Sequence, residues 1–189
     1  PSRMEGKYDI IILAVKQREN QNAAQFLYPF LEEDGALVTV QNGLPEAGLA
    51  EVFGKDRVYG CTLSWSAEKI APGTVRVTSD TGFHLALGAY GKGDKLDAIA
   101  ALFSHAGTLR VGNLAEIRYA KLAVNASFST LSAISGMTFL QLAQKHKKLV
   151  LGLMREVFAV ARANGCNRLM QNEHDIMKLF GGKFASFLL

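Results

Sequence analysis

The sequence predicts an α/β protein in which an open, mostly parallel sheet is followed by an all-helical region. Short β-branched apolar runs alternate with helical patterns up to about residue 113, and no strand pattern follows. The charge changes at the same point. Residues 1–113 contain 11 Lys/Arg and 13 Asp/Glu, a net charge of −2, whereas residues 114–189 contain 10 and 4, a net charge of +6. We therefore expect two domains, residues 1–113 and 114–189.

The first domain is expected to begin with a strand over residues 8–15, because a continuous apolar run of this length is typical of a strand buried on both faces of a parallel sheet. Two short strands over residues 74–78 and 83–87 are expected to form a hairpin around the turn 80–82. The other elements expected in this domain are helices over residues 23–31, 45–53 and 94–105 and strands over residues 36–40, 58–63 and 109–111.

The second domain is predicted to consist of helices. Apolar residues at helical spacing from Ile117 to Leu131 predict one long helix that ends near Gly136. A second helix is expected over residues 139–164, ended by Gly165 in a left-handed conformation, and a third helix is expected from Asn172.

Composition argues against several classes of protein. No apolar run reaches the roughly 18 residues of a membrane span, so we expect none. Cys61 and Cys166 lie far apart and the four histidines lack metal-ligand spacing, which argues against a disulfide scaffold and a metal site and favours the cytoplasm. No cationic block with interleaved aromatic residues occurs, so we expect no nucleic-acid partner.

Two candidate binding residues follow predicted strands. Lys16 comes directly after the strand 8–15, and Asn42 follows the strand 36–40. Ligands of open α/β sheets bind beyond the carboxyl ends of the strands, where a lysine can pair with a phosphate or carboxylate. The alternatives are a solvated loop lysine and a tight turn at Asn42-Gly43.

Lys121 is the candidate acid–base residue. It lies among apolar residues of the long helix, where partial desolvation disfavours the charged ammonium and helps the group to give up a proton. Asn125 and Ser129 follow at steps of four residues, so one helical face presents an amine, an amide and a hydroxyl to an oxygen-rich substrate. The alternative is a lysine whose stem crosses the helix shoulder while its ammonium stays in water.

The nearest approach to a glycine-rich nucleotide-binding turn is GKGDKL at residues 91–96. Leu96 replaces the third glycine, and Asp94 would repel a pyrophosphate at the start of the following helix. We interpret this segment as a plain turn.

Four segments occur in a specific order and spacing: DIIILAVK (residues 9–16), QNGL (41–44), PGTV (72–75) and KLAVN (121–125), the last followed by LSAI (131–134). Together they resemble the ketopantoate reductase family of NADP-dependent dehydrogenases. The resemblance covers essentially the whole chain.

The resemblance implies part of a Rossmann-type domain followed by a helical domain similar to the C-terminal domain of 6-phosphogluconate dehydrogenase. It implies reduction of a 2-keto acid by NADPH, typically 2-dehydropantoate to pantoate on the route to pantothenate and coenzyme A, with a homodimer as an assembly to test. Lys121 would be the proton donor, Lys16 a cofactor-binding residue, and Asn42 a contact of both cofactor and substrate. The further substrate-binding residues would be Asn125, Ser129 and Ser186.

Departures from the family pattern bear on the function. Ser129 and Phe139 stand where family members have asparagines, which leaves another 2-keto acid open as the substrate. The glycine-rich turn and closing helices of the family have no counterpart in residues 1–189, so we expect the middle part of such an enzyme, inactive by itself. An opine-type dehydrogenase and a non-catalytic binding module are the alternatives.

Overall fold

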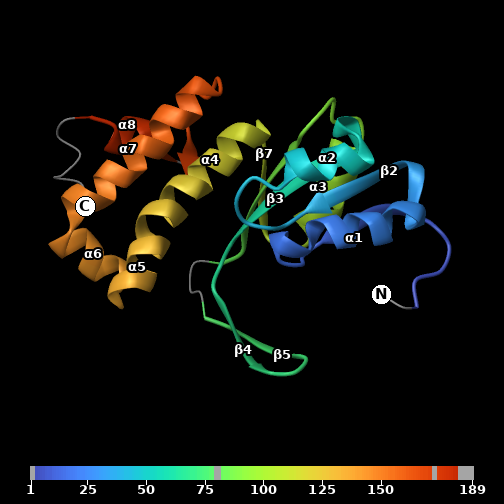
Figure 1. Cartoon of the computed structure of the whole chain (residues 1–189), viewed down its shortest axis with the longest axis horizontal. Coiled ribbons are helices and arrows are strands. Elements are labelled where there is room, and N and C mark those ends of the chain that lie inside the picture. The colour runs from blue at the N-terminus through green and yellow to red at the C-terminus, as the bar shows by residue number, and fades with distance from the viewer. Residues whose placement is uncertain (1–2, 79–81, 172–173, 183–189) are drawn as a thin grey trace. The chain divides into compact units, whose positions relative to one another are not determined.

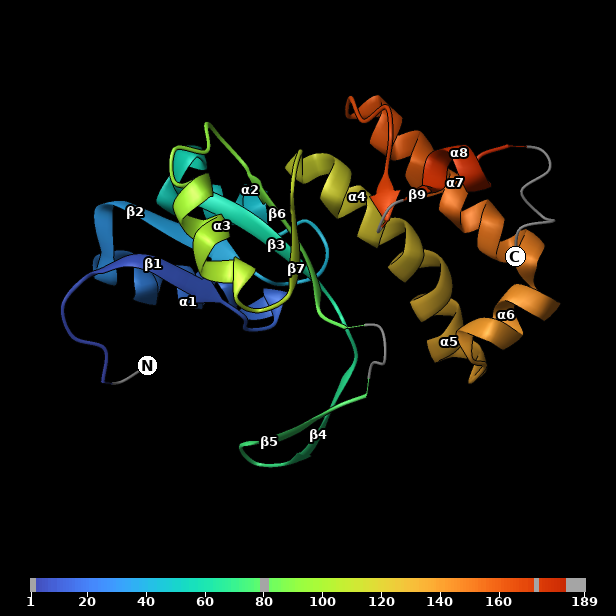
Figure 2. The same ribbon diagram turned by 180° about the vertical axis from the view of Figure 1, so that it is seen from behind.

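The computed structural model describes residues 3–78, 82–171 and 174–182 (Figures 1 and 2). The chain divides into two compact units, residues 1–114 and 115–189. We call them the sheet unit and the helical unit.

The sheet unit is built around a five-stranded sheet in the order β1-β2-β3-β6-β7. Strands β1, β2 and β3 are parallel, β6 is antiparallel to β3, and β7 is parallel to β6. This mostly parallel sheet confirms the predicted α/β class. The strands are β1 (Tyr8–Leu13), β2 (Leu31–Thr39), β3 (Val58–Ser64), β6 (His84–Ala89) and β7 (Thr108–Val111).

Helices cover both faces of the sheet. Successive side chains of a strand point to opposite faces, so neighbouring residues of one strand pack against different helices. Leu37 belongs to a core shared with α1 (Asn20–Leu27) and α2 (Glu46–Phe53). Its neighbours Ala36 and Val38 belong to a core shared with α3 (Leu96–Ser104). Figure 1 shows α1 and α2 on the side of the sheet nearer the viewer, and Figure 2 shows α3 on the opposite side.

The prediction that the first strand is buried on both faces is wrong. Within the described residues β1 lies at the edge of the sheet, and α3 packs over β6 and β7 at the other end. Ile11 and Leu13 are buried in the core of α1 and α2, whereas Ile12 on the opposite face is 49% exposed. An apolar run therefore predicted the strand but not its position in the sheet.

The predicted pairing of residues 74–78 with residues 83–87 is also wrong. β5 (Thr74–Val77) pairs with β4 (Ala67–Ala71), and β6 joins the main sheet instead. The turn between β4 and β5 is Pro72-Gly73, where Gly73 has a φ of 75° that favours glycine. The expected turn at residues 80–82 lies mostly outside the described residues. The β4–β5 hairpin projects away from the sheet (Figure 2).

The start of β2 contains a bulge. Leu31 pairs with Tyr8 and Ala36 pairs with Ile10, so the residues between Leu31 and Ala36 loop out of the ladder. The Arg57 side chain holds this bulge, since its Nε donates to the carbonyl of Gly35 at 3.1 Å and its Nη2 donates to the carbonyl of Glu32. The preceding helix ends at Leu27, four residues earlier than predicted, and a 3₁₀ turn (Tyr28–Phe30) leads into the strand.

The helical unit begins with one continuous helical segment that ends at Ser135, close to the predicted end. It consists of α4 (Leu114–Val124), a π-helical turn (Asn125–Ser129) and α5 (Thr130–Ser135). The π-helical turn was not predicted. The second predicted helix is divided into α6 (Phe139–Lys145) and α7 (Lys147–Ala163) at His146, whose φ of −128° is not helical.

The end of α7 confirms the predicted Gly165 cap. Gly165 has a φ of 82°. Its N–H donates to the carbonyl of Arg162 at 3.0 Å, and the N–H of Cys166 donates to the carbonyl of Ala161 at 3.0 Å. These two bonds form a Schellman motif. The predicted third helix is α8 (Ile176–Phe180), capped by Asp175; its predicted start, Asn172, lies outside the described residues. Short strands β8 (Met170–Gln171) and β9 (His174–Asp175) precede α8 and were not expected.

Among the described helices, none combines the length and the apolar character needed to span a membrane.

Candidate functional site

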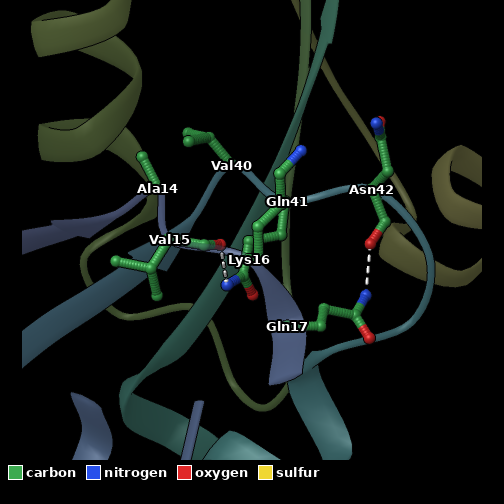
Figure 3. Close-up of a pocket in the computed structure, with 7 residues that line it drawn as sticks. All are labelled: Ala14, Val15, Lys16, Gln17, Val40, Gln41 and Asn42. Atoms are coloured by element: carbon green, nitrogen blue, oxygen red, sulfur yellow. Dashed lines mark hydrogen bonds between the residues drawn. The ribbon is translucent and has the colours of Figure 1, made fainter. Parts of the chain in front are cut away.

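A cleft of about 330 Å³ lies at the carboxyl ends of β1 and β2 (Figure 3). The two strands are parallel neighbours, Leu13 pairs with Thr39, and the N–H of Val40 donates to the carbonyl of Leu13 at 3.1 Å. The segments that follow β1 and β2 therefore leave the sheet side by side. Ligands of open α/β sheets bind at such a position. The residues that line the cleft are Ala14, Val15, Lys16, Gln17, Val40, Gln41 and Asn42.

The structure brings Lys16 and Asn42 together in this cleft, and both are exposed. Lys16 has an extended backbone (φ −65°, ψ 143°) and precedes a 3₁₀ turn, Gln17–Glu19, in which the N–H of Glu19 donates to the Lys16 carbonyl at 2.9 Å. The Gln17 side-chain amide donates to the main-chain carbonyl of Asn42, and the side-chain amide of Asn42 points away from Gln17 (Figure 3). Gly43 has a φ of 81°, so the tight turn considered as an alternative for Asn42 is present as well.

Sequence reasoning noted Gln41 only as part of the QNGL segment and missed its role, which is to connect the two strand ends. Its amide exchanges two hydrogen bonds with the amide of Asn20 and donates to the carbonyl of Val15. It also accepts a bond from the hydroxyl of Thr39 at 3.1 Å. The signal that could have indicated this role is the position of Gln41 between a buried strand and the candidate Asn42.

The second group of candidates lies on the helical unit. Lys121 is in α4, and Asn125 and Ser129 begin and end the π-helical turn. Lys121 and Asn125 are half-buried, and Ser129 is exposed. Ala120 and Ala123, one residue before and two residues after Lys121, are buried in the core of the unit. The ammonium group is thus carried by a helix whose adjacent face is apolar.

A buried serine lies within the π-helical turn. The N–H of Thr130 donates to the carbonyl of Asn125, five residues earlier, which widens the turn. Ser127 is fully buried, and its Oγ donates to the carbonyl of Ala123 at 2.6 Å. Such a serine competes for a carbonyl that an α-helix would otherwise use, and it disturbs the regular ladder. Turns of this kind occur frequently at functional sites.

The two groups of candidates belong to different units. Lys16 and Asn42 share one cleft of the sheet unit, and Lys121, Asn125 and Ser129 follow one another along one helical segment. Ser186 lies outside the described residues.

The lining of the cleft suits a phosphate-bearing organic cofactor. A cationic side chain, Lys16, can pair with a phosphate, and the amide of Asn42 can donate and accept hydrogen bonds. No group of three His, Cys, Asp or Glu side chains that could hold a metal ion is found in the described part of the chain.

Both units match one protein family. The profile described as "Ketopantoate reductase PanE/ApbA" matches residues 1–91, and the profile described as "Ketopantoate reductase PanE/ApbA C terminal" matches residues 113–181. The chain belongs to the ketopantoate reductase family. This confirms the resemblance predicted from the four sequence segments, and the family consists of oxidoreductases.

Individual members of the family are similar over most of the chain. A 2-dehydropantoate 2-reductase of Nostoc sp. is 28% identical, and the match covers 85% of this chain and 54% of that protein. The structure of 2-dehydropantoate 2-reductase from Geobacter metallireducens GS-15 matches with 28% identity and a TM-score of 0.78, covering 88% of this chain and 57% of that one. This chain therefore spans just over half the length of the relatives it matches.

The fold is shared more widely. A D-mandelate dehydrogenase in complex with NADH is 21% identical, with a TM-score of 0.75, and the match covers 84% of this chain and 55% of that chain. These structural matches confirm a Rossmann-like sheet unit followed by a helical unit.

Proposed function

We propose that the protein is a nicotinamide-dependent oxidoreductase that reduces a 2-keto acid, with 2-dehydropantoate as the first candidate substrate and NADPH as the reductant. Family membership supports this proposal, as does the Nostoc relative named 2-dehydropantoate 2-reductase. The observation that carries most weight is the sequence of amine, amide and hydroxyl along one helical segment, Lys121, Asn125 and Ser129, which changes to a π-helical pitch at Asn125.

The sheet unit is proposed to hold the cofactor at the cleft of Lys16 and Asn42. The Lys16 ammonium is suited to pair with a phosphate, and the Asn42 amide is suited to bond a ribose or carboxamide group. When bound there, the nicotinamide would supply the hydride for the keto carbon. NADP rather than NAD is part of the proposal, and parallel assays with NADPH and NADH test it.

The helical unit is proposed to hold the keto acid and to donate the proton. As the ketone carbon gains a hydride, negative charge develops on its oxygen, and the Lys121 ammonium donates a proton to that oxygen. Asn125 is proposed to donate a hydrogen bond to the substrate from the next turn of the helix, and Ser129 from the turn after that. Ser186 is a further proposed substrate contact.

One observation favours a second substrate class. Phe139, which stands where family members resembling this chain have an asparagine, stacks on Phe128 with ring centroids 5.1 Å apart and is 46% exposed. An apolar ring at this position makes a 2-keto acid with an apolar side chain the second candidate substrate.

A substrate panel tests the proposal. The complete gene product is assayed for NADPH oxidation with 2-dehydropantoate, with 4-methyl-2-oxopentanoate and with phenylglyoxylate. We expect the highest kcat/KM for 2-dehydropantoate. A higher kcat/KM for either of the two apolar keto acids would instead assign the protein to the second substrate class. A complete gene product that binds NADPH but reduces no 2-keto acid contradicts the proposed reaction and favours a non-catalytic binding module.

A homodimer and a cytoplasmic location stay predictions for the complete protein. Light scattering tests the first, and imaging of the tagged protein in cells tests the second.

A further inference from the structure

The amide of Gln41 connects three elements of the sheet unit. Gln41 follows β2, yet its Nε2 donates to the carbonyl of Val15, which follows β1, and to the Oδ1 of Asn20, the first residue of α1, at 2.6 Å. The Asn20 amide donates back to the Oε1 of Gln41 at 3.1 Å. Figure 3 shows the bond from Gln41 to Val15 as a dashed line.

The Gln41 side-chain amide is buried and hydrogen-bonded within the protein. Gln41 is only 7% exposed, and both hydrogens of its amide have acceptors. Its Oε1 accepts from Asn20 and from the hydroxyl of Thr39. The Oγ of Thr39 in turn accepts the main-chain N–H of Gln41 at 3.3 Å. A side chain with these bonds constrains the backbone around it, and its amide hydrogens are not available to a ligand.

The backbone constrained in this way carries the two candidate cofactor-binding residues. Val15 immediately precedes Lys16, and Gln41 immediately precedes Asn42. The Gln17 amide, which donates to the Asn42 carbonyl, forms a second connection between the same two turns. Lys16 therefore lies between two residues that are each tied to the segment containing Asn42.

We propose that Gln41 is a positioning residue whose buried amide ties the turn after β1 to the turn after β2, so that Lys16 and Asn42 present their side chains to one cleft. Its effect on catalysis rests on the proposed function, because it acts through the cofactor-binding role of that cleft. Its effect on the structure of the two turns does not depend on the proposed function.

The test uses the complete gene product with Gln41→Leu, which removes the amide at similar size, and a matched control, Arg57→Leu. Arg57 also ties main-chain carbonyls of β2, but at the opposite end of the strand. Both variants are expected to lower the midpoint of urea unfolding. Only Gln41→Leu is expected to raise the KM for NADPH, by about tenfold, with a smaller effect on kcat.

A double-variant cycle separates positioning from direct binding. If Gln41 acts through Lys16, then Gln41→Leu raises the KM for NADPH much less in a Lys16→Ala background than in the wild-type background. Full additivity of the two changes, or an equal KM effect of Arg57→Leu, overturns the proposal.

Hydrogen exchange gives a readout that needs no activity. Gln41→Leu is expected to speed the exchange of amides in residues 14–19 and 40–43, including the N–H of Glu19, while the β3–β6 ladder keeps its protection. Arg57→Leu is expected to leave residues 14–19 unchanged. Uniform acceleration over the whole sheet in Gln41→Leu overturns the proposal, even if the complete protein reduces no keto acid. If Gln41→Leu does not fold, Gln41→Glu keeps the acceptor atom and removes the donors, and the same pattern is expected.

Discussion

The Nε of Arg168 lies 3.3 Å from the Oε2 of Glu116, which joins the segment after α7 to the first turn of α4. The Glu116 side chain is 18% exposed and that of Arg168 is 68% exposed. The ion pair therefore connects the helix that carries Lys121 to the segment after α7, but its Arg168 side chain is exposed to water.

Replacement of Arg168 tests how much this ion pair contributes. Arg168→Met is expected to lower the free energy of unfolding by no more than about 1 kcal/mol, because solvent screens an exposed guanidinium. Urea unfolding measures the change, and at high salt the difference from wild type should become smaller. A loss of stability that does not depend on salt would instead assign the effect to packing of the arginine stem.

The Lys95 ammonium controls the ionisation of Asp34, from which it is separated by 2.9 Å. It lowers the pKa of the Asp34 carboxyl below its ordinary value of 3.8, first by a hydrogen bond and second by its charge. A lowered pKa in the folded chain stabilises the fold at pH values above the ordinary pKa of the carboxyl. This contribution is lost as the pH falls through the lowered pKa. An NMR titration should show the Asp34 pKa returning toward 3.8 in Lys95→Met.

The control for this titration is Lys92→Met, because Lys92 lies in the same segment but pairs with Asp56 instead, at 3.9 Å. The Asp34 titration should be the same in Lys92→Met as in wild type. An equal shift in both variants would mean that general charge, not the Lys95 contact, sets the pKa.

Cys166 predicts a loss of stability at alkaline pH. Burial, and to a lesser extent the Glu116 carboxylate, raise the pKa of the Cys166 thiol above its ordinary value of 9.0. The thiol is protonated in both states at lower pH, and as the pH rises through 9.0 the unfolded thiol ionises first. The folded state then loses at most about 1.4 kcal/mol per pH unit from this group. Urea unfolding at about pH 8 and about pH 10 should show a steeper decline for wild type than for Cys166→Ala, and equal declines would contradict this account.

Local sequence patterns predicted the elements whose causes are local. The Gly165 cap depends on a single residue that tolerates a φ of 82°, and α2 (Glu46–Phe53) begins one residue after its predicted start. The convergence of Lys16 and Asn42 also followed from a general rule, since parallel strands end at the same edge of a sheet. For these features, neighbours along the chain or a general rule of sheet geometry were sufficient.

The errors arose where the local pattern was weak or ambiguous, or where the partners are distant in sequence. The segment 74–78 could pair with either neighbour, and the short, mostly non-β-branched segment Ala67–Ala71 gave no strand pattern of its own. The exposure of Ile12 depends on strand order. The connecting role of Gln41 was missed because its partners lie 21 and 26 residues away. The π-helical turn contains Ser127, whose burial depends on packing of the helical unit.

Lys121 is the residue proposed to donate the proton in a 2-keto acid reduction. The direct test is the kcat of the complete gene product with Lys121→Ala, measured by NADPH oxidation at saturating 2-dehydropantoate, with Lys145→Ala as the control from the exposed end of α6. We expect kcat to fall at least about a hundredfold in Lys121→Ala, as for loss of a general acid, and to stay unchanged in Lys145→Ala. Near-normal turnover of Lys121→Ala with the substrate that the wild-type protein reduces best would contradict the assignment.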